Sequence, residues 1–237
     1  MSGLEKRGKL DSFFLGCGIV ILYFILPILL TLPFALLLEK WEKANSHFLL
    51  SVIYLTIEVL TVVVFAYISR KDLKEDFKDF KKNYRKHLVL SVNIWKYGLI
   101  IMVVTNLIIS RIIMNGNVAN NEAINQTILN VFPLYAYPAI IILGPIIEEL
   151  VFRLSFKRAF KNLLPFVLFT GILFGSIHVI SSMNNAKDLL FLIPYSALGI
   201  SFSLMYYRTK NIISNICIHV FHNTLSILLI IIANILR

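Results

Sequence analysis

Long apolar stretches separated by short polar segments dominate this chain. Each holds about 20 mostly apolar residues, the length that an α-helix needs to cross a bilayer. The stretches run roughly over residues 13–38, 47–68, 88–114, 132–152 or beyond, 164–180, 188–207 and 212–236. The first is too long for the core of a cleavable signal peptide, so we interpret it as a span. The pattern predicts an all-α, polytopic membrane bundle of seven or eight transmembrane helices, organised as one domain over residues 1–237.

Composition supports this interpretation and excludes several other classes. Hydrophobic residues make up 58% of the 237 residues and charged residues only 15%. A soluble domain of this size has too little interior to bury so much apolar surface. An ordinary cytosolic enzyme and a disordered chain are therefore excluded. The two cysteines, Cys17 and Cys217, both lie in apolar runs, so no disulfide framework is indicated.

The basic residues predict the orientation. With a cytoplasmic N-terminus, the inner segments hold 17 Lys and Arg, in groups of three, eight, four and two, and the outer segments hold four. Such an excess is the positive-inside signal. The loop over 115–130 carries no Lys or Arg and is expected outside. We therefore attribute the net charge of +10 to membrane orientation and expect no nucleic-acid partner.

The charged segment 69–87 alternates in sign, and Leu73, Phe77 and Phe80 recur at spacings of four and three. This spacing predicts an amphipathic helix. We expect a cytoplasmic connector that lies at the headgroups, with a docking surface for a partner as the alternative.

Ionisable residues inside the apolar stretches are the candidates for function, because each costs at least about 2.5 kcal/mol in a bilayer. The candidates are Glu58, Glu148, Glu149, His178, His219 and His222. All except Glu58 fall in the last four stretches. For Glu58, a hydrogen-bonded residue of the bundle is the simplest interpretation.

Glu148 is the strongest candidate for a general base. Glu149 and Arg153 are four residues apart, so they share a helix face and can pair. Glu148 points about 100° away and has no local cation. An unpaired carboxylate in an apolar setting suits proton abstraction, although the alternative is that all three are packing polar groups.

A helical hairpin would place His178 opposite Glu148. The midpoint of the two residues is 163, within the segment 161–165, and an antiparallel hairpin turning there puts both side chains roughly 20 Å from the turn. This requires the fourth helix to continue past Arg153 to about Asn162.

The last stretch adds hydrogen-bond donors. His219 and Asn223 lie one turn apart on one face, and imidazole and amide N–H groups can stabilise an oxyanion. His222 projects to one side. His219 lies only about 10 Å from the cytoplasmic end of its helix, a poor match in depth for Glu148 unless that helix starts deep or is tilted.

These motifs, in this order on successive predicted helices, resemble the family of CAAX proteases and bacteriocin-processing enzymes (CPBP, also called Abi). The matching residues are Glu148-Glu149-x-x-x-Arg153, Phe174-x-x-x-His178 and His219-x-x-x-Asn223. The resemblance covers about 132–235 and marks this part as the catalytic core. Ser196, Gly199 and Ser203 resemble the small residues of the family's intervening region, which permit close helix contact.

The resemblance implies an intramembrane endopeptidase of CAAX-protease type. Glu148 and His178 would activate a water, and His219 and Asn223 would stabilise the oxyanion. The supporting residues would be Glu149, Arg153 and Phe174, whereas His222 has no counterpart in the motifs.

The sequence leaves the metal dependence of the site open. Glu148, His178 and His219 would be the ligands of a zinc ion, but the helix lacks a His-Glu-x-x-His pattern, so we favour a metal-free, glutamate-type enzyme without a cofactor.

Two other functional classes also stay open. One is a non-enzymatic bacteriocin immunity or scaffold protein, and the other is a proton-coupled transporter. The Ile-, Asn- and Lys-rich composition favours a bacterial plasma membrane, with a membrane-delivered leader peptide, pheromone or bacteriocin precursor as substrate. The sequence does not indicate an oligomeric state.

Overall fold

The computed structural model describes residues 8–43 and 46–236, and every regular element in these ranges is helical. The basic residues Lys6, Arg7 and Arg237, which contribute to the predicted orientation, lie outside the described residues. Seven helical segments are long and apolar enough to span a bilayer, which confirms the predicted polytopic all-α bundle. They are Lys9–Lys43, His47–Ile68, Arg70–Ile113, Pro133–Leu154, Leu163–Ile180, Ala186–Thr209 and Ile212–Ala233.

The first three spans form from six helical elements. The first span consists of α1 (Lys9–Thr31), η1 (Leu32–Phe34) and α2 (Ala35–Lys43), and Pro33 stands at the start of η1. The second span is α3 (His47–Ile68). The third is α4 (Arg70–Ile108), which is extended by the π-helical turn η2 (Ile109–Ile113).

The later spans contain the candidate site residues. The short helix α5 (Asn120–Val131) leads into a fourth span made of α6 (Pro133–Pro138), η3 (Ala139–Leu143), α7 (Gly144–Glu149) and η4 (Leu150–Leu154). The fifth span is α8 (Leu163–Ile180). The sixth is η5 (Ala186–Phe191) with α9 (Leu192–Thr209), and the seventh is α10 (Ile212–Ile235).

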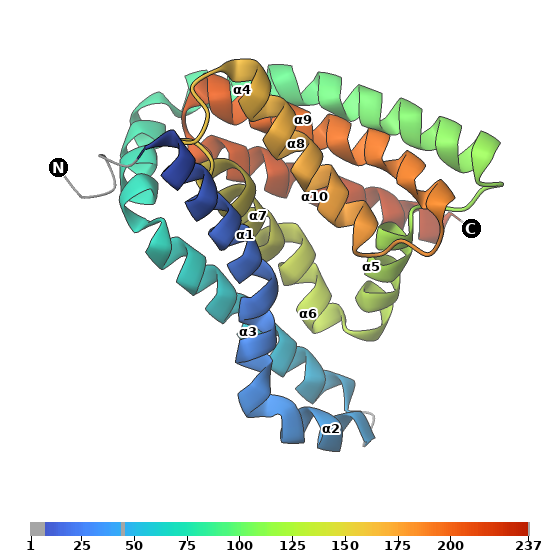
Figure 1. Ribbon diagram of the computed structural model, residues 1–237. Helices are drawn as coiled ribbons and strands as arrows, with labels where there is room; N and C mark the ends of the chain where they lie inside the picture. The colour runs from blue at the N-terminus through green and yellow to red at the C-terminus, as the bar shows by residue number, and fades with distance from the viewer. Residues whose placement is uncertain (1–7, 44–45, 237) are drawn as a thin grey trace.

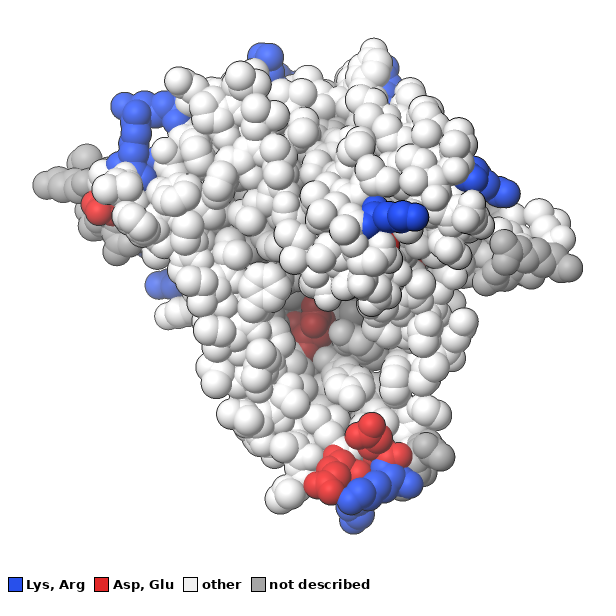
Figure 2. Space-filling view, turned by 45° about the vertical axis from the view of Figure 1, so that its right-hand side comes forward, with Lys and Arg blue, Asp and Glu red and all other residues white. Residues whose placement is uncertain are grey.

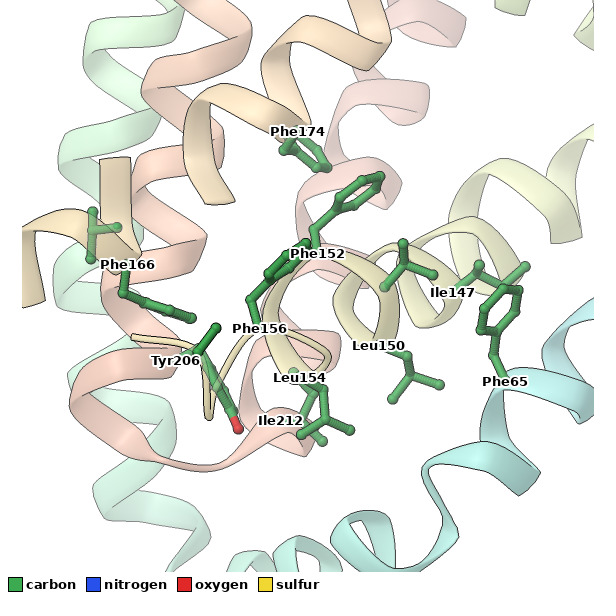
Figure 3. Close-up of a cluster of buried hydrophobic side chains, with 13 residues drawn as sticks. Phe65, Ile147, Leu150, Phe152, Leu154, Phe156, Phe166, Phe174, Tyr206 and Ile212 are labelled. Carbon is green, nitrogen blue, oxygen red and sulfur yellow. The ribbon is translucent and has the colours of Figure 1, made fainter. Parts of the chain in front are cut away.

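The spans form two groups that meet at α7 and η4. One group consists of α8, α9, α10 and the later part of α4, which lie side by side in Figure 1 with α9 in contact with the other three. In the other group, α3 contacts α1, α6 and α7. All five residues of η4 are buried, and Figure 3 shows its Leu150, Phe152 and Leu154 among aromatic and aliphatic side chains from neighbouring helices. The fourth span, which contains the predicted carboxylates, thus lies in the core of the bundle.

The fourth helix ends earlier than the hairpin prediction required. It stops at Leu154, residues 155–159 are turns and 160–162 are irregular, so the predicted continuation to Asn162 is wrong. The turn contains hydrogen bonds from Lys157 N to Leu154 O (3.4 Å) and from Ala159 N to Phe156 O (3.0 Å). Phe156 is fully buried, which pulls this part of the chain back against the core instead of letting it extend into water.

The charged segment at 69–87 is the beginning of α4 and contacts the start of α10. The Asp76 carboxylate accepts the backbone N–H of Ile212 (2.8 Å), which caps the helix end. Asp79 accepts hydrogen bonds from Asn83 (2.7 Å) and Asn211 (3.1 Å). The backbone leaves helical geometry at Asn83, where α4 is kinked. The segment therefore holds α10 through its acidic residues.

Small residues let α8 and α9 approach closely, as predicted for the region around Gly199. A Cβ atom on Gly171 would lie 2.6 Å from the backbone nitrogen of Ile200, and one on Gly199 would collide with the Gly171 carbonyl oxygen. Thr170 and Ser203 link the same two helices through a hydroxyl hydrogen bond (2.8 Å). Close backbone contact of this kind is how transmembrane helices gain packing energy without a hydrophobic effect.

We expect Gly199→Ala to lower the free energy of unfolding by about 1–3 kcal/mol, because the added methyl group meets a backbone atom that cannot rotate away. Thermal unfolding of the purified protein in detergent measures the change. Gly18→Ala on α1 is the matched control, since its Cβ would have nothing within 4 Å. Equal melting temperatures for both variants would contradict the predicted contact.

Candidate active site

Side chains from three helical segments meet inside the bundle around Glu148. α7 provides Glu148 and Glu149, α8 provides His178, and α10 provides His219. Glu148 Oε1 lies 3.7 Å from His178 Nε2, and Glu148 Oε2 lies 3.5 Å from His219 Nε2. The Glu148 side chain is 16% exposed and His178 is 19% exposed, so a small reactant can reach them, whereas His219 is only 3% exposed.

The pairing of Glu149 with Arg153 is observed as predicted, and it is completely buried. Glu149 Oε1 lies 3.2 Å from Arg153 Nη1, and both side chains have 0% exposure. Arg153 Nη2 also donates to the Gly199 carbonyl (3.2 Å), and its guanidinium lies over the Phe174 ring at 4.4 Å. The pair thus ties the fourth span to α8 and α9.

Glu149 also holds α10 in place. Its Oε1 lies 2.9 Å from His219 Nδ1, and its Oε2 accepts a hydrogen bond from Asn215 Nδ2 (3.1 Å). Asn215 stands four residues before His219, on the same face of α10. The one-turn spacing between Asn215 and His219 could have identified Asn215, but this residue was not predicted.

The hydrogen bonds of the two histidines determine which nitrogen faces Glu148. Nδ1 of His178 lies 2.9 Å from the Phe174 carbonyl oxygen, which can only accept, so this nitrogen carries a proton. The same reasoning applies to Nδ1 of His219 beside the Glu149 carboxylate. Both rings therefore direct Nε2 toward Glu148, the nitrogen whose protonation can change without loss of the anchoring bond.

Aromatic rings restrict the orientation of both imidazoles. The Phe174 ring lies 4.3 Å from that of His178, and the Tyr195 ring stacks near it at 5.4 Å with an interplanar angle of 25°. Phe202 lies 4.4 Å from His219. Tyr195 and Phe202 belong to α9, which carries no titratable motif residue, so their contribution was not predicted.

Asn223 has a structural partner outside this cluster. Its Nδ2 donates to the Ile140 carbonyl oxygen (2.7 Å). The π-turn η3 bonds Gly144 N to Ala139 O, so the next such bond would come from residue 145, which is a proline without an N–H. Asn223 thus supplies the donor that Pro145 lacks, and one of its two amide hydrogens is committed to this contact.

Two further candidates lie beside the cluster. His222 is buried, and its Nδ1 accepts a hydrogen bond from Trp95 Nε1 (3.4 Å), which links α10 to α4. Glu58 on α3 lies close enough to Glu148 for the two carboxyl groups to influence each other. Glu58 is partly buried, and its hydrogen-bonded role in the bundle stays a prediction. Figure 2 shows acidic side chains at the bottom of a hollow that is otherwise lined by uncharged residues.

The geometry around Glu148 does not form a metal site. In the described part of the chain, no group of three or more His, Cys, Asp or Glu side chains could hold a metal ion. Among the three predicted zinc ligands, Glu148 lies 3.7 Å from His178 Nε2 and 3.5 Å from His219 Nε2. We therefore derive no step through zinc.

Comparison with known proteins finds a family match over the segment that contains this site. Residues 130–225 match the family described as Type II CAAX prenyl endopeptidase Rce1-like. A relative in Bacillus subtilis (strain 168), named "Putative membrane peptidase YdiL", is 33% identical over 111 residues, which is 44% of this chain and 41% of the relative. The match thus covers less than half the length of that relative. A comparison with solved structures finds no significant match. The resemblance inferred from the motifs is confirmed for the segment that contains all of them: residues 130–225 are similar to the Rce1-like CAAX endopeptidases.

Proposed function

We propose that this protein is an intramembrane endopeptidase that hydrolyses a peptide bond of a membrane-associated peptide or protein. The observation that carries the proposal is the Glu148 carboxylate, which lies within 3.7 Å of the Nε2 atoms of two histidines whose opposite nitrogens are anchored. Similarity to a peptidase family over the same residues supports the hydrolase class.

The first step of the proposed reaction activates a water between Glu148 and His178. Both groups can accept hydrogen bonds from one water, because neutral His178 presents the lone pair of Nε2. Glu148 takes one proton, and the resulting hydroxide forms a bond to the carbonyl carbon of the peptide. The electron pair of the carbonyl π-bond moves to its oxygen, which becomes an oxyanion.

His219 and Asn223 would stabilise that oxyanion. Nδ1 of His219 already donates to Glu149, so Nε2 donates to an oxyanion only when the ring is an imidazolium, with Glu149 as its counter-ion. Asn223 would use the amide hydrogen that does not bond Ile140. The oxyanion re-forms the carbonyl as the C–N bond breaks and Glu148 returns its proton to the leaving nitrogen. This yields an amine and a carboxylic acid, and the acid then loses its proton to water.

We propose that the reaction is of the glutamate type and needs no metal. In support of this proposal, no group of three or more His, Cys, Asp or Glu side chains in the described part of the chain is placed to hold a metal ion. As substrate class we propose a leader peptide, a peptide pheromone or a bacteriocin precursor, delivered from a bacterial plasma membrane. The half-buried position of Glu148 supports a substrate that enters from the bilayer.

Comparative peptidomics of cells with wild-type protein or Glu148→Ala tests the function and identifies the substrate. We expect at least one membrane-associated peptide to accumulate unprocessed in the variant, because the side chain that activates the water is missing. Cells with Glu39→Ala, which alters an exposed carboxylate on α2, are the matched control. Identical peptide profiles in all three strains would contradict the proposal, and retained protection against a bacteriocin would then favour an immunity protein.

A further inference from the structure

A cavity of about 240 Å³ lies where the turn after η4 meets the end of α9, away from Glu148. Three cationic side chains line it, Lys157, Arg158 and Lys210, together with aromatic side chains that include Phe166 and Tyr207. Basic and aromatic residues around one cavity are suited to an anionic group that carries an apolar body.

The cavity holds more positive charge than its neighbouring carboxylates neutralise. Lys157 Nζ lies 2.5 Å from Asp72 Oδ1, and Arg158 Nη2 lies 3.5 Å from the same atom. Asp76 also interacts electrostatically with Lys157, so two carboxylates face these two cations. Lys210 forms no ion pair among the described residues, and its Nζ lies over the Tyr207 ring at 3.7 Å. An added anion would neutralise this excess.

Lys210 has an unusual backbone for its residue type. It ends α9 in the left-handed region, with φ 54° and ψ 26°, where glycine or asparagine is common. Partial burial lowers the pKa of its ammonium group, because removal from water penalises the charged form. The Lys210 side chain stays exposed enough to reach an anion in the cavity that it lines.

The cavity lies at the ends of two predicted membrane spans, where lipid headgroups are expected. The spans Pro133–Leu154 and Ala186–Thr209 end immediately before Lys157 and Lys210. This end of the bundle also contains the beginning of α4, through its Asp72 contacts. Basic pockets between transmembrane helices at this depth suit phospholipid headgroups. A soluble acidic partner has no acyl chains, so the aromatic walls of the cavity would add little to its binding.

We propose that this cavity binds the phosphate of an anionic phospholipid headgroup between Lys157, Arg158 and Lys210, with the aromatic side chains against the glycerol and first acyl carbons. The bound lipid would join the turn after η4 to the end of α9.

Native mass spectrometry of the full-length protein in detergent, titrated with phosphatidylglycerol or phosphatidylcholine, tests this site. We expect the wild type to retain phosphatidylglycerol preferentially, and the triple variant Lys157→Gln, Arg158→Gln, Lys210→Gln to lose affinity about a hundredfold, since each basic residue contributes about fivefold. The single variant Lys210→Gln, which leaves the Asp72 pairs intact, should lose about fivefold and guards against misfolding of the triple variant.

A second triple variant, Lys71→Gln, Lys74→Gln, Lys78→Gln, removes the same charge from exposed positions of α4 that do not line the cavity. It should bind phosphatidylglycerol like the wild type. Equal losses in the two triple variants would overturn the site in favour of a diffuse positive surface. Displacement of the lipid by millimolar inorganic phosphate would assign the cavity to free phosphate, and displacement by a soluble acidic peptide would assign it to a protein partner.

Discussion

Glu148→Gln is expected to reduce peptide-bond hydrolysis by the purified protein by about a thousandfold or more, with little change in KM. The glutamine keeps the size of the side chain and its place between His178 and His219, but it cannot take a proton from water. General-base catalysis contributes about 10²–10⁴-fold to a rate, which sets the size of the expected loss. The assay uses the peptide identified in cells, incubated with enzyme in detergent or liposomes.

The control for this variant is Glu122→Gln on α5, a partly buried carboxylate outside the cluster. It should retain wild-type kcat. Both variants should melt at the wild-type temperature, so that a loss of rate reports chemistry rather than folding. Full activity of Glu148→Gln would rule out the proposed base.

The same assay decides between the glutamate-type and metal-dependent mechanisms. The wild-type rate should not change after incubation with a chelator, because the contacts of Glu148 with the histidines need no ion. Inhibition by a chelator that is reversed by zinc would show that a metal is required and would replace the proposed role of Glu148.

Arg153→Met is expected to give the largest loss of stability among single substitutions at the site. Glu149 would remain as a buried carboxylate without its counter-ion, and breaking a buried pair from one side costs about 3–5 kcal/mol. The double variant Glu149→Gln, Arg153→Met should be more stable than Arg153→Met alone, because no uncompensated charge is left inside. Reversible unfolding in detergent, followed by far-UV circular dichroism, measures both values.

The exposed pair of Glu39 and Lys43, whose side chains are 2.7 Å apart, provides the comparison. Glu39→Gln should change the unfolding free energy by less than about 1 kcal/mol, since exposed ion pairs contribute little. A similar small effect of Arg153→Met would mean that water reaches the buried pair. The double variant should still have low activity, because a glutamine at position 149 would lack the negative charge that Glu149 presents to His219.

Contacts within one helix were predictable from the sequence. Glu149 and Arg153 are one turn apart, so their pairing depends only on helix geometry, and the structure places their side-chain atoms 3.2 Å apart. The small residues of α9 around Gly199 were likewise visible as a pattern, although the helix that they contact was not. Such features depend on neighbours in sequence.

A contact between two helices was predictable only where it does not depend on the exact shape of the loop that joins them. Glu148 and His178 do meet, although the fourth helix ends at Leu154 and the hairpin is not symmetric. The early end of the fourth helix also explains why His219 lies at the depth of Glu148. Glu148 stands six residues before Leu154 and His219 stands seven after Ile212, so the two lie at comparable distances from their helix ends.

The sequence by itself determined the membrane class, the number of spans and the identity of the charged residues inside them, because hydropathy and helical periodicity are local properties of the chain. The tertiary structure alone decided that Asn223 replaces the missing donor of Pro145 and that Tyr195 lies against His178. It also decided that one acidic residue, Glu149, anchors two helices while its neighbour faces both histidines. Where a helix ends and how deep a side chain lies depend on packing against distant segments, such as Phe156 against the core, and no local pattern encodes that contact.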